Sequence, residues 1–443
     1  MRPAPEAKVH GRHLRPWTLA WLAALCLGAC AGSVPPLVQA SPDVVAAASD
    51  ATPTDLAAPV SDTHDVAVQA ADAGPADAGA ACPPACDAAA DLAPGDGGPP
   101  PTTVFVHHPK AAVLTLRGDT VPLTWTGDLA PTAIEGNVAR FELPTVGKAI
   151  QVKAFRQGAW AHFANHVVQP HEQRHMYPYF DVKSASPRRE DFTLPGPKGG
   201  KRTLRAWLPP GYDENLQANY PLLLMMDGQN LFEDGTASFG VSWQLGGAAI
   251  AAMTAAKLGE VVIVGIDHAG VQRIDEYTPW PDQKKGQGGG GVQFVDWVQT
   301  TVLPDLAQRY RLKPGREARA IGGSSLGALI SLYAAMAQPQ TWGAAVCMSG
   351  AWWWQGKKMQ TWVGQAYDPK LPLRIWLDAG DVDDGLEETQ ALRDALLALG
   401  IPTPLGLGYY VAKGANHSEA AWAKRAHLPL QFLFDPGNLE KPF

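Results

Sequence analysis

One short motif has the residue types and spacing of a serine nucleophile. The segment Gly323-Ser324-Ser325-Leu326-Gly327 reads G-x-S-x-G, and it lies directly after an apolar run and directly before a helical pattern over residues 326–337. In that setting the central serine stands on a sharp turn, with its hydroxyl exposed at the edge of a sheet. Flanking glycines suit the turn because they have no β-carbon to clash. The motif predicts Ser325 as a nucleophile that attacks acyl groups.

Such a serine needs a general base, and a histidine should follow it along the chain after an intervening acid. Of the twelve histidines, only His417 and His427 come after Ser325. His427 lies within a predicted amphipathic helix over residues 418–434, whereas His417 lies in a loop between a predicted strand and that helix. A loop position near the end of a strand suits a base, and we predict His417.

The acid that orients the histidine should lie in a loop between these two residues. The run Leu373-Arg-Ile-Trp-Leu is a predicted strand, and Asp378, Asp381, Asp383 and Asp384 follow it. Asp378 still belongs to the strand, and the other three lie in the loop. Spacing alone does not separate neighbouring residues, so Asp383 is our first choice and Asp384 the alternative.

The oxyanion of an acyl-transfer intermediate needs two backbone N–H donors. One is expected from Leu326, the residue after the nucleophile, and the second from the loop after an earlier strand. The segment Met226-Asp-Gly-Gln-Asn, which ends the most apolar predicted strand, is the candidate for that loop.

The elements around these residues alternate between strands and helices. Apolar runs predict strands at residues 204–208, 221–226, 261–266, 318–322, 344–348, 373–377 and 407–411. Helical patterns lie between them, at about 244–257, 292–310, 326–337, 386–399 and 418–434. Continuous apolar strands that alternate with helices predict an α/β fold, with a mostly parallel sheet and helices on both faces.

Composition limits the function classes that remain. The chain of 443 residues is 46% hydrophobic and 18% charged, which is enough apolar material for a large core. Its net charge of −7 argues against a nucleic-acid partner, because phosphate binding needs basic surfaces. The single apolar run of membrane character lies at the N-terminus, which excludes a polytopic membrane protein.

The pattern of the first hundred residues predicts an export signal followed by a tether. Basic residues precede a short apolar stretch, and Leu27-Gly-Ala-Cys30 follows it, which resembles the bacterial lipobox. We predict a lipoprotein signal peptide over residues 1–29, lipidation of Cys30, and a disordered tether over residues 30–101. Residues 31–101 contain ten Asp and no Lys or Arg. Cys82 and Cys86 are candidates for a small disulfide, since exported proteins allow one.

Residues 102–183 form a region of a different kind, with short β-rich runs separated by turn residues. This alternation of short strands and turns predicts a small all-β sandwich. With Trp160 and Tyr177-Pro-Tyr-Phe, the region resembles the immunoglobulin-like, starch-binding-type modules that precede some bacterial esterases. Trp125 and Trp160 would then be sugar-stacking platforms or, alternatively, core residues.

Residues 184–443 resemble the bacterial putative-esterase family of α/β-hydrolases, which includes feruloyl and enterochelin esterases. The matching segments are Asp227-Gly-Gln-Asn, Arg273-Ile-Asp-Glu-Tyr-Thr-Pro, Gly322-Gly-Ser-Ser-Leu-Gly, Ser349-Gly-Ala-Trp-Trp-Trp and Asn416-His-Ser-Glu-Ala-Ala-Trp. The resemblance implies Ser325 as nucleophile, His417 as base and an acid from the aspartate loop. It also implies the Gln229 and Leu326 amides as oxyanion donors.

The substrate pocket is less well marked in the sequence. Trp352 and Trp353 follow a strand end and are candidates for its wall, with sheet-edge packing as the alternative. Arg273 and Tyr277 are further pocket candidates, although a structural pair between Arg273 and Glu276 is the favoured interpretation of that segment.

The prediction is therefore an exported, membrane-tethered serine esterase at the bacterial cell envelope, at the outer membrane or cell surface. It would hydrolyse carbohydrate-linked, aryl or siderophore-type esters through an acyl-enzyme, with a small-molecule or glycan ester as substrate. This chemistry needs no metal or cofactor. The alternatives are a non-catalytic carbohydrate-binding or adhesion lipoprotein on the same fold, and an acyltransferase. The sequence does not indicate the oligomeric state.

Overall fold

A computed structural model describes residues 100–162 and 164–434 of the chain. The predicted signal peptide and tether, with Cys30, Cys82 and Cys86, lie outside the described residues. Within the described part of the chain, no helix combines the length and the apolar character that crossing a membrane would need.

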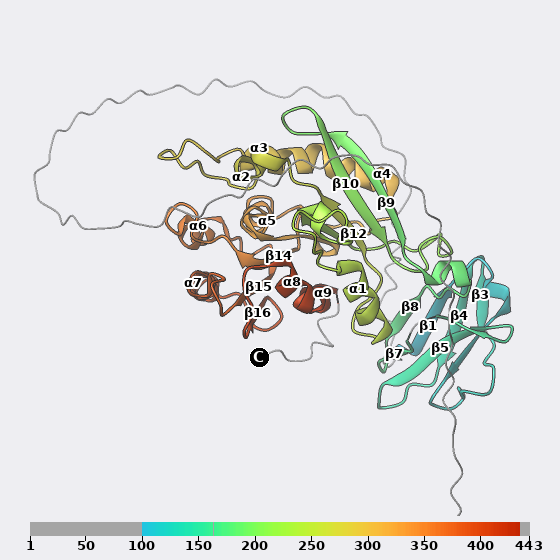
Figure 1. The fold of residues 1–443 in the computed structure, drawn as a ribbon. Helices are drawn as coiled ribbons and strands as arrows, with labels where there is room; N and C mark the ends of the chain where they lie inside the picture. Colours follow the sequence, from blue (N-terminus) through green and yellow to red (C-terminus); the bar gives the residue numbers. More distant parts are fainter. Residues whose placement is uncertain (1–99, 163, 435–443) are drawn as a thin grey trace, which may run out of the picture. The chain divides into compact units, whose positions relative to one another are not determined.

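A central sheet of eight strands organises the larger part of the described chain (Figure 1). Its order is β16-β15-β14-β13-β11-β12-β10-β9, and the six strands from β16 to β12 run parallel. The other two strands of this sheet pair in an antiparallel manner, β10 with β12 and β9 with β10. The bounds are β9 Arg188–Pro195, β10 Lys201–Leu208, β11 Leu222–Met226, β12 Val262–Ile266, β13 Arg319–Ser325, β14 Ala344–Gly350, β15 Arg374–Gly380 and β16 Leu407–Ala412.

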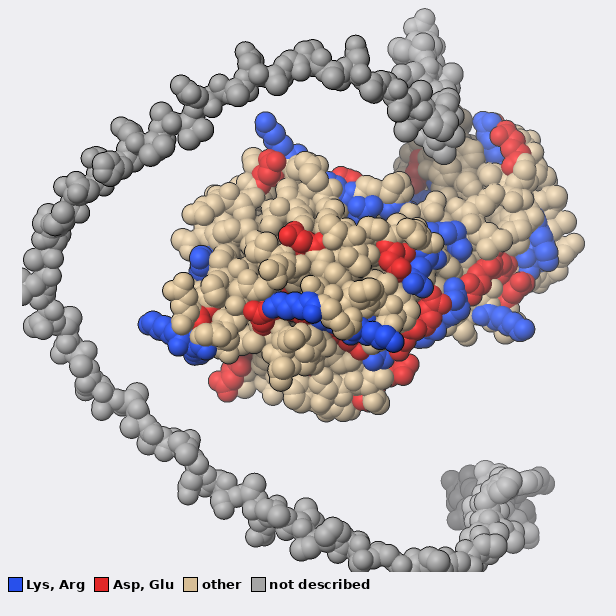
Figure 2. All heavy atoms as spheres, turned by 90° about the horizontal axis from the view of Figure 1, so that it is seen from above, with Lys and Arg blue, Asp and Glu red and all other residues tan. Residues whose placement is uncertain are grey.

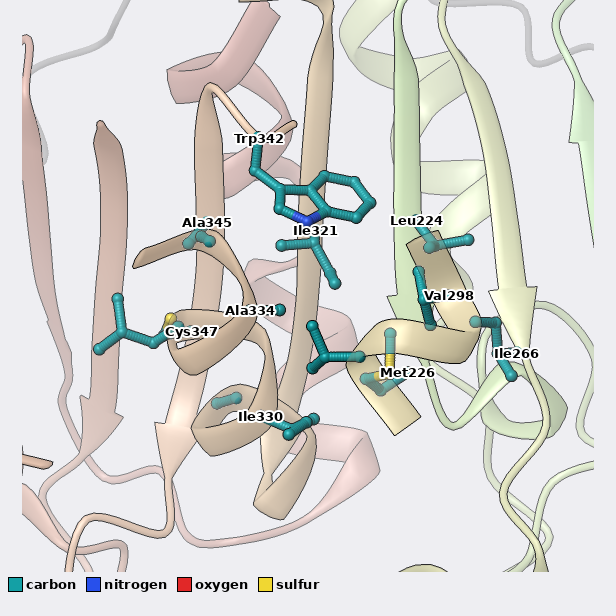
Figure 3. Close-up of a cluster of buried hydrophobic side chains, with 14 of the residues drawn as sticks. Leu224, Met226, Ile266, Val298, Ile321, Ile330, Ala334, Trp342, Ala345 and Cys347 are labelled. Carbon is teal, nitrogen blue, oxygen red and sulfur yellow. The ribbon is translucent and has the colours of Figure 1, made fainter. Parts of the chain in front are cut away.

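Helices cover both faces of this sheet, because its strands are apolar on both sides. Along β11, Leu222, Leu224 and Met226 pack into one core, while Leu223 and Met225 pack into a second. Figure 3 shows part of the first core, where helix side chains such as Ile330 and Val298 meet strand side chains. The first core includes side chains of α3 (Gly291–Trp297), α4 (Leu303–Arg309), α5 (Leu326–Ala337), α6 (Lys358–Ala366) and α7 (Leu386–Ala398), and the second those of α1 (Leu245–Thr254), α8 (Glu419–Arg425) and α9 (His427–Phe434).

This arrangement is an α/β-hydrolase-like fold, as the sequence predicts. The seven expected strands and five expected helical segments are present, with differences in detail. The segment over 292–310 contains a π-helical turn at Val298–Val302, and the segment over 418–434 is two helices. Strand β9 and helix α6 are not among the elements that the sequence predicts. Cys347 is a buried free thiol within the first core (Figure 3).

The first described elements form two small sheets around one apolar core. One sheet has the order β3-β4-β1-β8, and in the other β5 pairs with β2, β6 and β7. Val104 and Phe141 from the first sheet and Leu114 and Val152 from the second are buried together. Assignment of this region to the immunoglobulin-like, starch-binding type stays a prediction. The strands are β1 Thr102–His107, β2 Leu114–Gly118, β3 Ala133–Glu135, β4 Val138–Leu143, β5 Ile150–Arg156, β6 Ala159–Trp160, β7 His166–Val168 and β8 Gln173–Met176.

Charges of both signs are mixed on the surface. On the face drawn in Figure 2, Lys and Arg lie among Asp and Glu of the described residues, without a broad basic area.

Candidate active site

Ser325 lies on a sharp turn between β13 and α5. Its backbone has φ 54° and ψ −122°, a strained conformation for a residue other than glycine. The flanking glycines are required by close packing. A β-carbon on Gly323 would lie 2.7 Å from the carbonyl carbon of Gly327, and one on Gly327 would lie 3.0 Å from Met226 Cβ. The pattern G-x-S-x-G is thus explained by backbone contact across the turn at Gly323 and by the close approach of β11 at Gly327.

Ser325 and His417 line the same cavity, whose volume is about 330 Å³. The remaining lining residues come from the end of β13, from the segments that follow β11 and β12, and from α8. Parallel strands bring their carboxyl ends to one edge of a sheet, where loops from distant parts of the chain meet. The lining is Asp227, Asn230, Ser238, Phe239, His268, Arg273, Ser324, Ser325, His417, Glu419 and Trp422.

His417 is oriented by a carboxylate on one side and an indole on the other. Its Nδ1 lies 2.6 Å from Oδ1 of Asp384. Its ring contacts Trp422 edge-on, with centroids 5.1 Å apart and an interplanar angle of 84°. A proton on Nδ1, held by the carboxylate, leaves Nε2 as the basic nitrogen of a neutral imidazole. The side chain of His417 is 40% exposed, so it is accessible from the cavity.

The partner of His417 corrects our first choice of acid. Asp383 is exposed and has no hydrogen bond to His417, whereas Asp384, the alternative, is 3% exposed and makes that bond. The loop explains the difference, because Asp383 adopts φ 49°, and the next side chain turns inward. Asp381 is exposed and accepts a hydrogen bond from the Gly414 amide. Asp378 is buried and contacts Arg425.

Asp384 is held in its ionised form. Burial by itself raises the pKa of this carboxyl, but hydrogen bonds from His417, Ser349 and the Gly380 amide outweigh burial and lower the pKa below 3.8. Donors directed at an ionised carboxylate favour that form. The ionised carboxylate therefore lies directly beside the imidazole ring of His417.

The two predicted oxyanion donors lie just after the ends of two adjacent strands. Strands β11 and β13 pair in parallel, with Met225 opposite Gly322. Gln229 follows β11 in a short 3-10 turn (Gly228–Asn230), and Leu326 is the first residue of α5. The first N–H groups of a helix have no partner within the helix. The Gln229 side chain contacts Ser238 and the His268 amide. The roles of the two backbone amides stay a prediction.

Comparison with known proteins identifies the family of this chain. The family model described as putative esterase matches residues 198–425, just over half of the chain. The chain belongs to the putative esterase family. Membership of this family supports carboxylic ester hydrolysis as the reaction class.

Individual relatives of this esterase-family chain have low sequence identity to it. The uncharacterized protein YbbA of Bacillus subtilis is 28% identical over 251 residues, which is 54% of this chain and 94% of YbbA. A siderophore triacetylfusarinine C esterase of Aspergillus fumigatus is 26% identical over 38% of this chain and 57% of its own length. Among solved structures, the enterobactin esterase FES of Shigella flexneri is 14% identical over 75% of this chain and 93% of that one, with a TM-score of 0.45.

Arg273 is the one predicted pocket residue that lines the cavity. It does not pair with Glu276, as we had favoured from the sequence. Its guanidinium instead donates two hydrogen bonds to Asp227, at 2.8 and 2.7 Å. Glu276 is buried and pairs with Arg202 at 2.8 Å. Tyr277 is fully buried, and its hydroxyl accepts a hydrogen bond from the backbone amide of Asp227, the partner of Arg273.

The tryptophans predicted as pocket walls lie elsewhere. Trp352 is fully buried in the first core, and Trp353 is 55% exposed and contacts Trp354. Neither lines the cavity that holds Ser325. Glu419 and Phe239, which do line it, were missed. Glu419 follows His417 by two residues and was inside the quoted Asn416-His-Ser-Glu segment, whereas Phe239 lies in a polar loop without a distinguishing pattern.

Proposed function

We propose that this chain is a serine esterase, in which Ser325 is the nucleophile, His417 the general base and Asp384 the orienting acid. The observation that carries the proposal is that Ser325 and His417 share one cavity while Asp384 contacts His417 Nδ1 at 2.6 Å. Nucleophile, base and acid thus come from the strand ends at which this fold builds catalytic sites.

The reaction follows from these positions. Ser325 attacks the ester carbonyl carbon while Nε2 of His417 takes its proton, and Asp384 stabilises the resulting imidazolium. The amides of Gln229 and Leu326 stabilise the negative oxygen, and losing one such donor typically raises the barrier by about 3 kcal/mol. The imidazolium then protonates the leaving alcohol. Water, activated by His417, hydrolyses the acyl-enzyme.

The substrate is proposed to be a carboxylic ester of the carbohydrate-linked, aryl or siderophore type. The name of the Aspergillus fumigatus relative, a siderophore esterase, supports the last of these. The cavity carries both polar groups, such as Arg273 and Glu419, and the aromatic side chain of Phe239. Phe239 is 78% exposed at this cavity, which gives an aryl or acyl group an apolar surface to contact.

A fluorophosphonate probe tests the nucleophile directly. Labelling should be lost in Ser325→Ala and retained in Ser331→Ala, which changes a buried serine of α5 outside the cavity. Retained labelling in Ser325→Ala would contradict the proposal. A panel of acetyl, feruloyl, long-chain acyl and catecholate esters would then define the substrate. Product analysis in the presence of a second alcohol would distinguish hydrolysis from acyl transfer.

A second candidate function is sugar binding by the small β region. Trp125 and Trp160 are 37% and 39% exposed, and their rings lie 6.1 Å apart. Arg117 packs over the Trp160 ring and pairs with Asp128, so charged groups flank the two aromatic surfaces. Co-sedimentation with insoluble polysaccharides should fall in Trp160→Ala but not in Val121→Ala, an exposed apolar control. Equal sedimentation of both variants would count against sugar binding.

Export and membrane attachment through Cys30 are also part of the proposal. Their support is the basic, apolar and small-residue pattern that ends at Cys30. Lipid chains contribute about 0.8 kcal/mol for each methylene buried in the bilayer, so several chains on one residue anchor a protein firmly.

A further inference from the structure

A chain of buried polar side chains runs from Asp384 into the protein interior. Near the end of β14, Ser349 donates its hydroxyl proton to Asp384 Oδ2 across 2.5 Å. Ser349 Oγ accepts hydrogen bonds from Arg425 Nη2 at 2.7 Å and from Trp422 Nε1 at 2.9 Å. Arg425 in turn donates from Nε to Asp378 at 3.0 Å. All five residues are at most 4% exposed.

The two donors that Ser349 receives fix the direction of its own proton. A guanidinium and an indole N–H can donate hydrogen bonds but cannot accept them. A hydroxyl has two acceptor sites and one proton. Because Arg425 and Trp422 occupy both acceptor sites, the Ser349 proton has only Asp384 to bond. Hydrogen bonds linked in this way polarise and strengthen one another.

The backbone of Ser349 gives an independent indication that its side chain has a role. Ser349 has φ 46°, a region in which glycine is unstrained and other residues are disfavoured. Strained residues of this kind cluster at functional sites, where the surrounding structure holds them. Here a serine occupies the position, and its hydroxyl makes three buried hydrogen bonds.

We propose that Ser349 is a positioning residue for Asp384, a role that rests on the serine-esterase function proposed above. Oδ2 of Asp384 receives the Ser349 hydroxyl and the Gly380 amide, each at 2.5 Å. Oδ1 is thereby left for His417. Rotation of the carboxylate would break bonds at Oδ2, so the imidazole is kept in the tautomer whose Nε2 is basic.

Arg425, which donates a hydrogen bond to Ser349, is itself held in place by buried groups. Its guanidinium is anchored by the Asp378 carboxylate and by the Ala421 carbonyl oxygen, at 3.0 and 3.1 Å. Its Nη2 also lies 3.5 Å from Asp384 Oδ2. Because α8 supplies Arg425 and Trp422, this helix is coupled to the acid loop through the Ser349 hydroxyl and through the ion pair between Arg425 and Asp384.

A double-mutant cycle tests the proposal. Ser349→Gly removes the hydroxyl and suits φ 46°, and Ser349→Ala is a second variant should the first fail to fold. The kcat/KM for p-nitrophenyl acetate is measured with and without Asp384→Ala. With Asp384 present we expect a loss of about tenfold to a hundredfold, typical of a hydrogen bond to a charged group. With Asp384→Ala we expect almost no further loss, because residues that act through one another are not additive.

Ser331→Ala is the matched control, since this buried serine of α5 has no side-chain hydrogen bond within the described structure. It should leave kcat/KM unchanged in both backgrounds. The low-field proton resonance of His417 Nδ1 should shift or disappear in Ser349→Gly and stay in Ser331→Ala.

Equal losses in both backgrounds, or an unchanged resonance in Ser349→Gly, would overturn the positioning role while leaving the esterase intact. A wild-type protein that hydrolyses no ester and takes up no fluorophosphonate would instead remove the proposed function, and the positioning role with it.

Discussion

The proposed acid, Asp384, shows how a single residue position decides which carboxylate contacts His417. Asp383 and Asp384 are adjacent in sequence, but only Asp384 is buried against His417. The left-handed conformation of Asp383 turns the chain at this point. Backbone dihedral angles decide which of two neighbouring carboxylates faces inward. The spacing of residue types in a sequence does not encode these angles.

Exchange of each aspartate for asparagine separates the two candidates. Asp384→Asn should lower kcat by about ten-thousand-fold, because an amide stabilises the wrong imidazole tautomer. Asp383→Asn is the matched control, since its side chain is exposed and asparagine tolerates a positive φ. Steady-state hydrolysis of p-nitrophenyl acetate measures both variants. A larger loss for Asp383→Asn would reverse the assignment.

Asp384 should also contribute to stability in a pH-dependent way. Hydrogen bonds hold its pKa below the usual 3.8 despite burial, so the unfolded chain binds this proton more readily than the folded chain. The stabilisation is therefore present above about pH 4 and is lost as the pH falls through the folded pKa. Urea unfolding of wild type and Asp384→Asn should show a difference in unfolding free energy that shrinks below about pH 4. A difference that stays constant down to about pH 3 would contradict this prediction.

At the scale of elements, the sequence determined most of the fold because the central strands are apolar on both faces. β11 reads Leu-Leu-Leu-Met-Met and is entirely buried, so few alternatives exist for it. β9 was missed because its Arg-Arg-Glu-Asp segment forms the polar edge of the sheet. α6 was missed because only Met359 and Val363 of its nine residues are buried. Edge strands and short surface helices carry weak periodic signals.

The site was only partly predictable for a related reason. Ser325 and His417 are marked by a local motif and by chain order, which a sequence displays. The cavity wall is assembled from loops far apart in the chain, such as those that hold Phe239 and Arg273. The expected wall residue Trp352 follows a strand end just as an active-site residue would, but its ring is packed into the core. Side-chain direction after a strand depends on packing that residue types alone do not specify.

The turn between β13 and α5 provides a test at this scale. Gly323→Ala would place a methyl group 2.7 Å from the Gly327 carbonyl carbon, so the turn must shift. We expect a loss of stability of about 1–3 kcal/mol, as for other overpacked sites, together with a loss of activity. Gly247→Ala on α1 is the control, because its β-carbon would meet no atom within 4 Å. Thermal unfolding should show Gly247→Ala equal to wild type or more stable by about 0.5–1 kcal/mol. An equal effect of both variants would contradict the packing argument.

At the scale of the whole molecule, catalysis and attachment are proposed to be separate properties of separate parts of the chain. The cavity is lined by residues between Asp227 and Trp422. The proposed lipid anchor, Cys30, precedes the first described strand by about seventy residues of Ala-, Pro- and Asp-rich sequence. If that segment acts as a tether, removing the anchor should release the enzyme without changing its chemistry.

Cys30→Ser tests this separation in the full-length chain expressed in a bacterial host. The wild-type protein should sediment with membranes, whereas the variant should move to the soluble fraction, because a serine cannot form the thioether that carries the lipid. Cys26→Ser makes the same change four residues upstream, within the segment expected to be removed with the signal peptide, and should still sediment. The kcat/KM for a water-soluble ester should be the same for all three, since none of the altered residues lines the cavity. Membrane recovery of Cys30→Ser equal to that of wild type would show that another part of the chain attaches the protein, and a loss of activity on release would show that catalysis depends on the anchor.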